Sequence, residues 1–272
     1  MLKLLKYELK KRVSTLITFV ILLLAAEGLA LYLINKGREY AVLGSFVIGL
    51  MFFGVVLLAF LDVAIQYYGD FKKSQGTLLF LTPNNGFKIV GSKMLFGAME
   101  LFLGIGIVAL LAWAANSFAV SKGLVGIEPE LAKLKEIMEL GYGEGNVGFV
   151  IAGFLFLVFL QYLTTQSIAV SSITLGRTIL SKNQYNWFWA VLLFIGVSIG
   201  VQTLNGLVIM LIGMGDGLFS STFIISAAEA ETSAEVSKSI GKIIFAGGME
   251  YIFWIILSFF VSSMLLNKKV DI

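Results

Sequence analysis

Six long apolar runs, separated by short polar segments, constrain the fold of this chain more than any other feature. They occupy residues 14–34, 41–66, 94–115, 147–175, 187–213 and 243–266. A helix needs roughly 20 apolar residues to cross the 30 Å hydrocarbon core of a bilayer, and each run reaches that length. The runs do not show the alternating polarity of transmembrane β-strands. The sequence therefore predicts an all-α integral membrane protein with six transmembrane helices in one transmembrane domain, residues 1–272.

The composition agrees with this class and excludes several chemistries. Of the 272 residues, 58% are hydrophobic and 14% are charged. The chain has no Cys and no His, so it lacks the usual ligands of zinc and the usual general base. We expect no catalytic residue, metal site or bound cofactor on this chain, and no nucleic-acid partner. The expected environment is membrane lipid.

The distribution of Lys and Arg predicts the orientation. Thirteen of the 20 Lys and Arg residues lie at the two termini or in the segments after the second and fourth runs. Positively charged residues concentrate on the cytoplasmic side, so both termini are predicted to be cytoplasmic. The first run is too long for the 7–15 residue core of a signal peptide, and we interpret it as an uncleaved span.

The N-terminal segment, MLKLLKYELKKR, is amphipathic when drawn as a helix. Leu2, Leu5, Leu9 and Val13 gather on one side, and lysines line one flank. This pattern favours an interfacial helix over residues 1–13, lying among the lipid headgroups. The alternative is an ordinary basic anchor with no helix of its own.

The longest predicted cytoplasmic loop reads FKKSQGTLLFLTPNNGFKIVGSK, residues 71–93. Pro followed by Asn-Asn-Gly is typical of a turn. The apolar segment before the turn has no hydrocarbon to enter, so it either rests on lipid headgroups or lies as a short helix in a protein groove. The residues of this segment and its turn are Gly76, Thr77, Leu78, Leu79, Phe80, Leu81, Thr82 and Pro83.

This loop, the basic N-terminus and the six-run layout resemble the permeases of type 2 ABC transporters. The resemblance implies a coupling helix at 76–83 that docks on a separate ATP-binding subunit, which would bind ATP and Mg. It also implies a second permease chain, identical or related. Independently of the resemblance, the apolar stripe of residues 127–139 predicts a short helix that caps the outer mouth or lies on the membrane, and residues 215–242 look partly helical. The resemblance implies that short outer helices in the latter segment close the exit. The location would be a bacterial plasma membrane, and the cargo of such an exporter would be a peptide, an antibiotic or other drug, or a lipid-like molecule. No GxxxxGK(S/T) string occurs, so this chain is not expected to hydrolyse ATP.

Four acidic residues fall within or at the edges of the runs: Glu27, Asp62, Glu100 and Glu250. A carboxylate is costly in lipid, and the sequence suggests no Lys or Arg well inside a span to pair with them. Each is therefore a candidate for the transport path, where it would favour cationic or amphipathic cargo. For Asp62, Glu100 and Glu250, which lie near the predicted ends of their spans, interfacial or structural roles are the preferred interpretation, and for Glu27 the two interpretations stay open.

Small polar residues form a second pattern in the fourth and fifth runs. Gln161, Thr164, Ser167, Ser171 and Thr174 share one face of a helix. Such a stripe lines a polar path or, in our preferred interpretation, lets helices pack closely and share hydrogen bonds. Gly196 and Gly200 form a GxxxG pattern, which favours close helix crossing within one subunit or at a dimer interface.

Other classes of function also have sequence arguments. Residues 213–216 read GMGD, the GxGD string of intramembrane aspartyl proteases, but that chemistry needs a second Asp at similar depth, and Asp62 lies near the opposite side. A transporter independent of ATP would often show inverted repeats with broken helices, and the two halves show no such correspondence. A membrane scaffold without transport activity is a further alternative.

Overall fold

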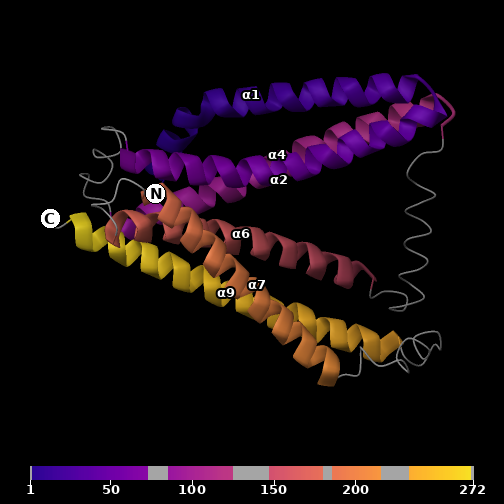
Figure 1. The fold of residues 1–272 in the computed structure, drawn as a ribbon. Helices are drawn as coiled ribbons and strands as arrows, with labels where there is room; N and C mark the ends of the chain where they lie inside the picture. Colours follow the sequence, from indigo (N-terminus) through magenta and orange to yellow (C-terminus); the bar gives the residue numbers. More distant parts are fainter. Residues whose placement is uncertain (1, 73–84, 125–146, 180–185, 216–232, 271–272) are drawn as a thin grey trace. The chain divides into compact units, whose positions relative to one another are not determined.

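The computed structural model describes residues 2–72, 85–124, 147–179, 186–215 and 233–270. These residues form six α-helices and, within the described ranges, no strand. The helices are α1 (Leu2–Asn35), α2 (Arg38–Lys72), α4 (Gly86–Ser121), α6 (Val147–Ile179), α7 (Asn186–Gly215) and α9 (Ser233–Val270). Figure 1 shows them as long rods. Each contains a stretch that is long and apolar enough to cross a membrane, which confirms the six predicted spans.

The helices extend well beyond the predicted spans. α2 has 35 residues and α4 has 36, so at 1.5 Å per residue each is about 50 Å long, against about 30 Å of hydrocarbon. α1 runs without interruption from Leu2, so the predicted interfacial segment and the first span form one helix. At the other end of the chain, residues 233–242 of the predicted outer segment form the first turns of α9.

The segment 71–93 was predicted as one loop, and this is wrong for its last part. α4 begins at Gly86, so residues 86–93 are already helical. Asn85 caps the helix, with its side-chain oxygen accepting a hydrogen bond from the Phe87 amide at 3.3 Å. The asparagine that suggested a turn therefore starts the helix, and the residues after it are ordered as its first turns.

The helices pack as two three-helix units. One unit, Met1–Pro129, contains α1, α2 and α4, and the other, Glu130–Ile272, contains α6, α7 and α9. In the first unit the chain reverses between α1 and α2 at Gly37, whose φ of +118° suits glycine better than any other residue. The core of this unit is aliphatic and aromatic and includes Val55, Val63, Tyr67 and Val108.

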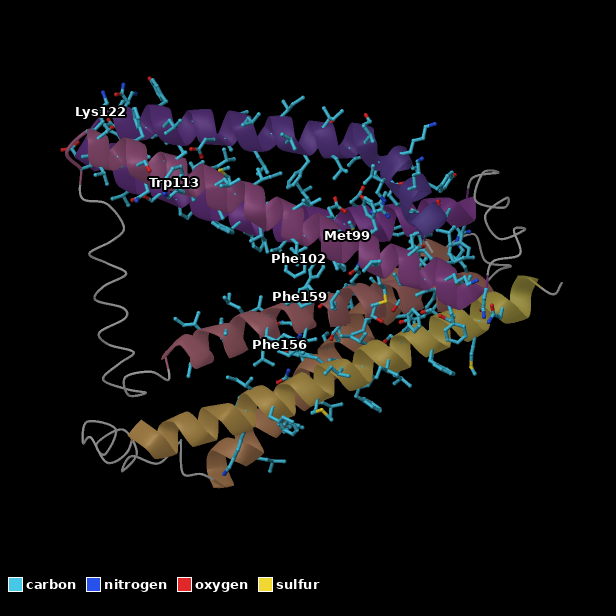
Figure 2. All side chains as sticks on the ribbon, turned by 180° about the vertical axis from the view of Figure 1, so that it is seen from behind. Met99, Phe102, Trp113, Lys122, Phe156 and Phe159 are labelled. Atoms are coloured by element: carbon cyan, nitrogen blue, oxygen red, sulfur yellow. The ribbon has the colours of Figure 1, made fainter. Side chains whose placement is uncertain are left out.

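Large apolar side chains cover much of the outside of both units, as lipid-facing helices require. Basic and aromatic residues meet at one end of the first unit. The Lys36 ammonium lies 4.9 Å from the centre of the Tyr32 ring, and that of Lys122 lies 5.5 Å from the Phe118 ring. Figure 2 shows Lys122 at the end of α4, with Trp113 further in along the helix. Such residues favour the boundary between hydrocarbon and headgroups.

A close contact between α2 and α4 predicts a sensitive position. A Cβ placed on Gly104 would lie 2.5 Å from Cγ1 of Val55, a stiff and fully buried side chain. We expect Gly104→Val to lower the free energy of unfolding by about 1–3 kcal/mol through overpacking. Gly106→Val on the same helix is the matched control, because a Cβ there meets no atom of the described chain within 4 Å. Thermal unfolding of the two purified variants makes the comparison, and equal melting temperatures would refute this helix contact.

Candidate functional site: a buried charged cluster beside a groove

Seven charged side chains meet at one end of the first unit, and we call them the charged cluster. They come from all three helices of the unit: Glu8, Lys11 and Arg12 from α1, Asp62 and Asp70 from α2, and Lys93 and Glu100 from α4. Glu8, Arg12 and Lys93 are at most 1% exposed. Burial this deep requires charges to be paired, and each of the seven has an opposite charge within reach.

Arg12 holds one half of the cluster together. Its guanidinium donates a hydrogen bond to the Asp62 carboxylate at 2.8 Å and lies 3.5 Å from the carboxylates of Glu8 and Glu100. The same guanidinium stacks 4.4 Å from the centre of the Phe96 ring, a contact that suits arginine. One residue of α1 therefore contacts both α2 and α4.

Lys93 and Asp70 hold the other half. The Lys93 ammonium pairs with both Asp70 and Glu8, and Asp70 also pairs with Lys11. Lys93 thus ties the first turns of α4 to α1 and to the last turns of α2. In the sequence, Asp70 and Lys93 stand on either side of the segment that connects α2 to α4.

Helical spacing explains why each helix can supply its charges. Glu8 and Arg12 are four residues apart, Asp62 and Asp70 eight, and Lys93 and Glu100 seven. Each spacing is close to one or two helical turns, so both members of each pair lie on the same face. Three helices with a charged stripe at the same end can then pack those stripes against one another.

The expectation that Asp62 and Glu100 would lack a basic partner was wrong. Arg12 pairs with both of them. The prediction failed because it assigned Arg12 to a separate interfacial helix, whereas Arg12 belongs to the continuous helix α1 and lies beside α2 and α4. The matching charge spacings in the three segments were the available signal.

A groove of about 420 Å³ adjoins the cluster. Its polar end contains Asp62 and Glu100, and its walls come from α1 and α2. The lining residues are Ser14, Thr15, Thr18, Phe19, Leu22, Leu58, Leu61, Asp62, Ile65 and Glu100. The groove therefore combines an acidic end with a mostly apolar wall.

The other two predicted acids, Glu27 and Glu250, form no ion pair with the charged cluster in the described structure. Glu27 on α1 is 5% exposed, and neither of its carboxylate oxygens accepts a hydrogen bond from the part of the chain that the structure describes. Glu250 on α9 is partly buried, one turn before Trp254. Among the predicted acids of the first unit, the structure brings Asp62 and Glu100 together around Arg12.

The polar stripe of α6 faces α9 for part of its length. The Thr164 hydroxyl lies 3.3 Å from the Tyr251 carbonyl oxygen, and the Ser167 hydroxyl 3.3 Å from that of Ile255. Ser171 and Thr174 are buried and bond to carbonyls of their own helix, whereas Gln161 is exposed. Gln166 and Ser172 of α6 are also buried, but helical spacing places them on other sides of the helix, so the spacing argument did not select them. These contacts favour packing between helices over a polar path.

Other predicted features are free of contacts or lie outside the described ranges. A Cβ on Gly196 or Gly200 would meet nothing within 4 Å in the described structure, so the GxxxG pattern of α7 is not used for packing there. The predicted coupling residues 76–83, the outer segment 127–139 and Asp216 of the GxGD string all lie outside the described residues.

The fold and the site define the class of this protein. It is a multi-pass membrane protein. Its described residues are all-helical, with six helices that can span a bilayer and a buried charged cluster at one end of the first unit. No family model, curated protein or solved structure matches the chain.

Proposed function

We propose that this chain is the membrane-spanning permease subunit of a type 2 ABC exporter. It would form a translocation path with a second permease chain, and a separate ATP-binding subunit would hold ATP and Mg. Both termini would face the cytoplasm of a bacterial cell, and the charged cluster would lie on the same side. The cargo would be a peptide, a drug or a lipid-like molecule.

The observation that supports this proposal most is the position of the charged cluster. Residues 73–84 connect α2 to α4 and contain the proposed coupling segment. Asp70 lies two residues before the end of α2, and Lys93 lies seven residues after the start of α4. These two residues pair with each other and with residues of α1. A force applied to the connecting segment would therefore reach all three helices together, as an ATP-driven permease requires.

The cost of building the cluster points the same way. Burying ions far from water costs several kcal/mol for each ion. Apolar side chains of similar volume in the same place are often at least as stabilising as a buried ion pair. A cluster that joins three helix ends is better explained by a need for a fixed, specific arrangement than by stability alone. Two of its members, Asp70 and Lys93, flank the connecting segment in the sequence, which is consistent with transmission of movement.

Co-purification of the chain from its native membrane tests the proposal. The wild type is expected to retain a stoichiometric ATP-binding subunit, identified by mass spectrometry. Leu79→Asp/Phe80→Asp is expected to lose that subunit while still inserting in the membrane, because two carboxylates would enter an apolar contact. The control, Leu134→Asp/Met138→Asp, makes the same change in a segment predicted to lie on the outer side and should retain the subunit.

Two results would count against the proposal. If no ATP-binding subunit accompanies the wild type, a transporter driven by an ion gradient becomes the better interpretation. If the subunit stays bound to Leu79→Asp/Phe80→Asp, the coupling contact lies elsewhere on the chain.

A further inference from the structure

We propose that the groove between α1 and α2 binds an amphiphile with a primary ammonium head and a single alkyl tail. The head would lie against Asp62 and Glu100, and the tail along the apolar walls. This inference concerns ligand binding by the chain itself and does not depend on an ATP-binding partner.

The charges at the polar end of the groove favour a cation. The charged cluster contains four carboxylates but only three basic groups, so one negative charge remains when all are ionised. The two carboxylates that line the groove share one cation, Arg12, which also approaches Glu8. No Lys or Arg is among the described residues that line the groove.

Glu100 is the group best placed to receive the head. Its side chain is 6% exposed, and it lines the groove. Its Oε2 atom accepts no hydrogen bond from the described chain, and the nearest Arg12 nitrogen is 3.5 Å away. A buried carboxylate with an oxygen that accepts no hydrogen bond is costly, so a positive charge bound beside Glu100 in the groove would stabilise it.

The hydroxyl groups favour a primary ammonium over a quaternary one. Ser14, Thr15 and Thr18 line the groove with Asp62 and Glu100. The Thr18 hydroxyl donates to the Ser14 carbonyl at 3.0 Å, which leaves its oxygen free to accept. A primary ammonium offers three N–H donors to carboxylate and hydroxyl oxygens, whereas a quaternary ammonium offers none.

The walls and the volume of the groove fit an alkyl tail. Phe19 and Leu22 of α1, with Leu58, Leu61 and Ile65 of α2, form the apolar part of the groove lining. Its volume of about 420 Å³ lies within the range of roughly 300–1,000 Å³ that is usual for small-molecule sites. The combination of an acidic end with an aliphatic wall matches a long-chain amine better than a small hydrophilic cation.

Photolabelling with an analogue of dodecylamine that carries a diazirine on its tail tests the inference. The purified full chain would be labelled in phosphatidylcholine nanodiscs and the labelled residues mapped by mass spectrometry. We expect labels on α1 and α2 around Phe19, Leu22 and Leu58. Unlabelled dodecylamine should compete, whereas dodecanol and dodecyltrimethylammonium, with the same tail, should compete at least about tenfold less well.

Two variants test separately the binding of the ammonium head and of the alkyl tail. Glu100→Gln should weaken competition by dodecylamine about tenfold or more, and Leu58→Trp, which narrows the groove without changing a charge, should reduce labelling of the wall. Glu27 is also a buried acid, but it lies on α1 and does not line the groove, so Glu27→Gln should behave as the wild type. Thermal unfolding verifies that each variant is folded, and Leu58→Trp decides the question if Glu100→Gln does not fold.

The inference is overturned if dodecanol competes as well as dodecylamine, since the groove would then accept any lipid tail. Labels elsewhere on the chain, or full competition in both groove variants, would also overturn it. None of these results would bear on association with an ATP-binding subunit, so this test and the co-purification fail independently.

Discussion

Arg12→Met is expected to destabilise the first unit by about 3–5 kcal/mol, the usual cost of removing one partner from a buried ion pair. Asp62 and Glu100 have no basic partner other than Arg12 in the described chain, and Glu8 would lose one of its two. The variant would also lose the contact between the guanidinium and the Phe96 ring. A reduced yield of folded protein in the membrane and a lower melting temperature in detergent are the readouts.

Three further variants identify the cause of this loss. Lys10→Met removes a charge from an exposed position on the same helix and should change the melting temperature little. Arg12→Lys keeps the charge but not the planar fork, so its stability should be intermediate. Adding Glu100→Gln to Arg12→Met removes one unpaired carboxylate and should recover part of the loss. Equal stability of Arg12→Met and Lys10→Met would show that the cluster does not hold the helices together.

Lys93→Met is expected to loosen the first turns of α4 more than it lowers overall stability. Its two partners keep other cations, because Asp70 still pairs with Lys11 and Glu8 still lies near Arg12. What disappears is the direct link from the start of α4 to α1 and α2. We therefore expect a smaller drop in melting temperature than for Arg12→Met, together with greater movement between α2 and α4.

The absence of cysteine makes this movement measurable by spin labelling. Cysteines introduced at Ile65 of α2 and Leu95 of α4, both exposed, can carry one label each. Pulsed electron paramagnetic resonance should give a narrow distance distribution in the parent protein and a broader one with Lys93→Met. Lys88→Met, at an exposed position on α4, is the control and should leave the distribution narrow. A narrow distribution in Lys93→Met would show that the charged cluster does not fix the start of α4.

Lys93→Met also tests the proposed function, because it separates binding of the ATP-binding subunit from transmission of movement. If the cluster transmits movement from the ATP-binding subunit, Lys93→Met should still bind that subunit, because residues 76–83 are unchanged. Nucleotide trapping should then shift the label distances less uniformly than in the parent. A complex that fails to form in Lys93→Met would instead place the cluster at the contact itself.

The number and approximate positions of the helices could be predicted from the sequence because crossing a bilayer imposes a strict local requirement. Every backbone polar group in hydrocarbon must be satisfied within the chain, so 20 consecutive apolar residues are sufficient evidence of a helix. The ends of α1 and α4 were harder to predict from the sequence, because a helix continues into water wherever capping and packing support it. Asn85 and the pairing of Lys93 supply that support at α4.

The charges at 8, 12, 62, 70, 93 and 100 were visible in the sequence, and so was their helical spacing within each segment. Which of them meet depends on the rotation and relative height of three helices, and these are decided by packing between residues far apart in the chain, such as Gly104 against Val55. The sequence by itself thus determined a membrane protein of six helices, since that follows from local hydrophobicity. Only the tertiary structure decided that Arg12 pairs with Asp62 and Glu100 and that a groove opens beside them, because ion pairs between helices depend on a geometry that local patterns do not contain.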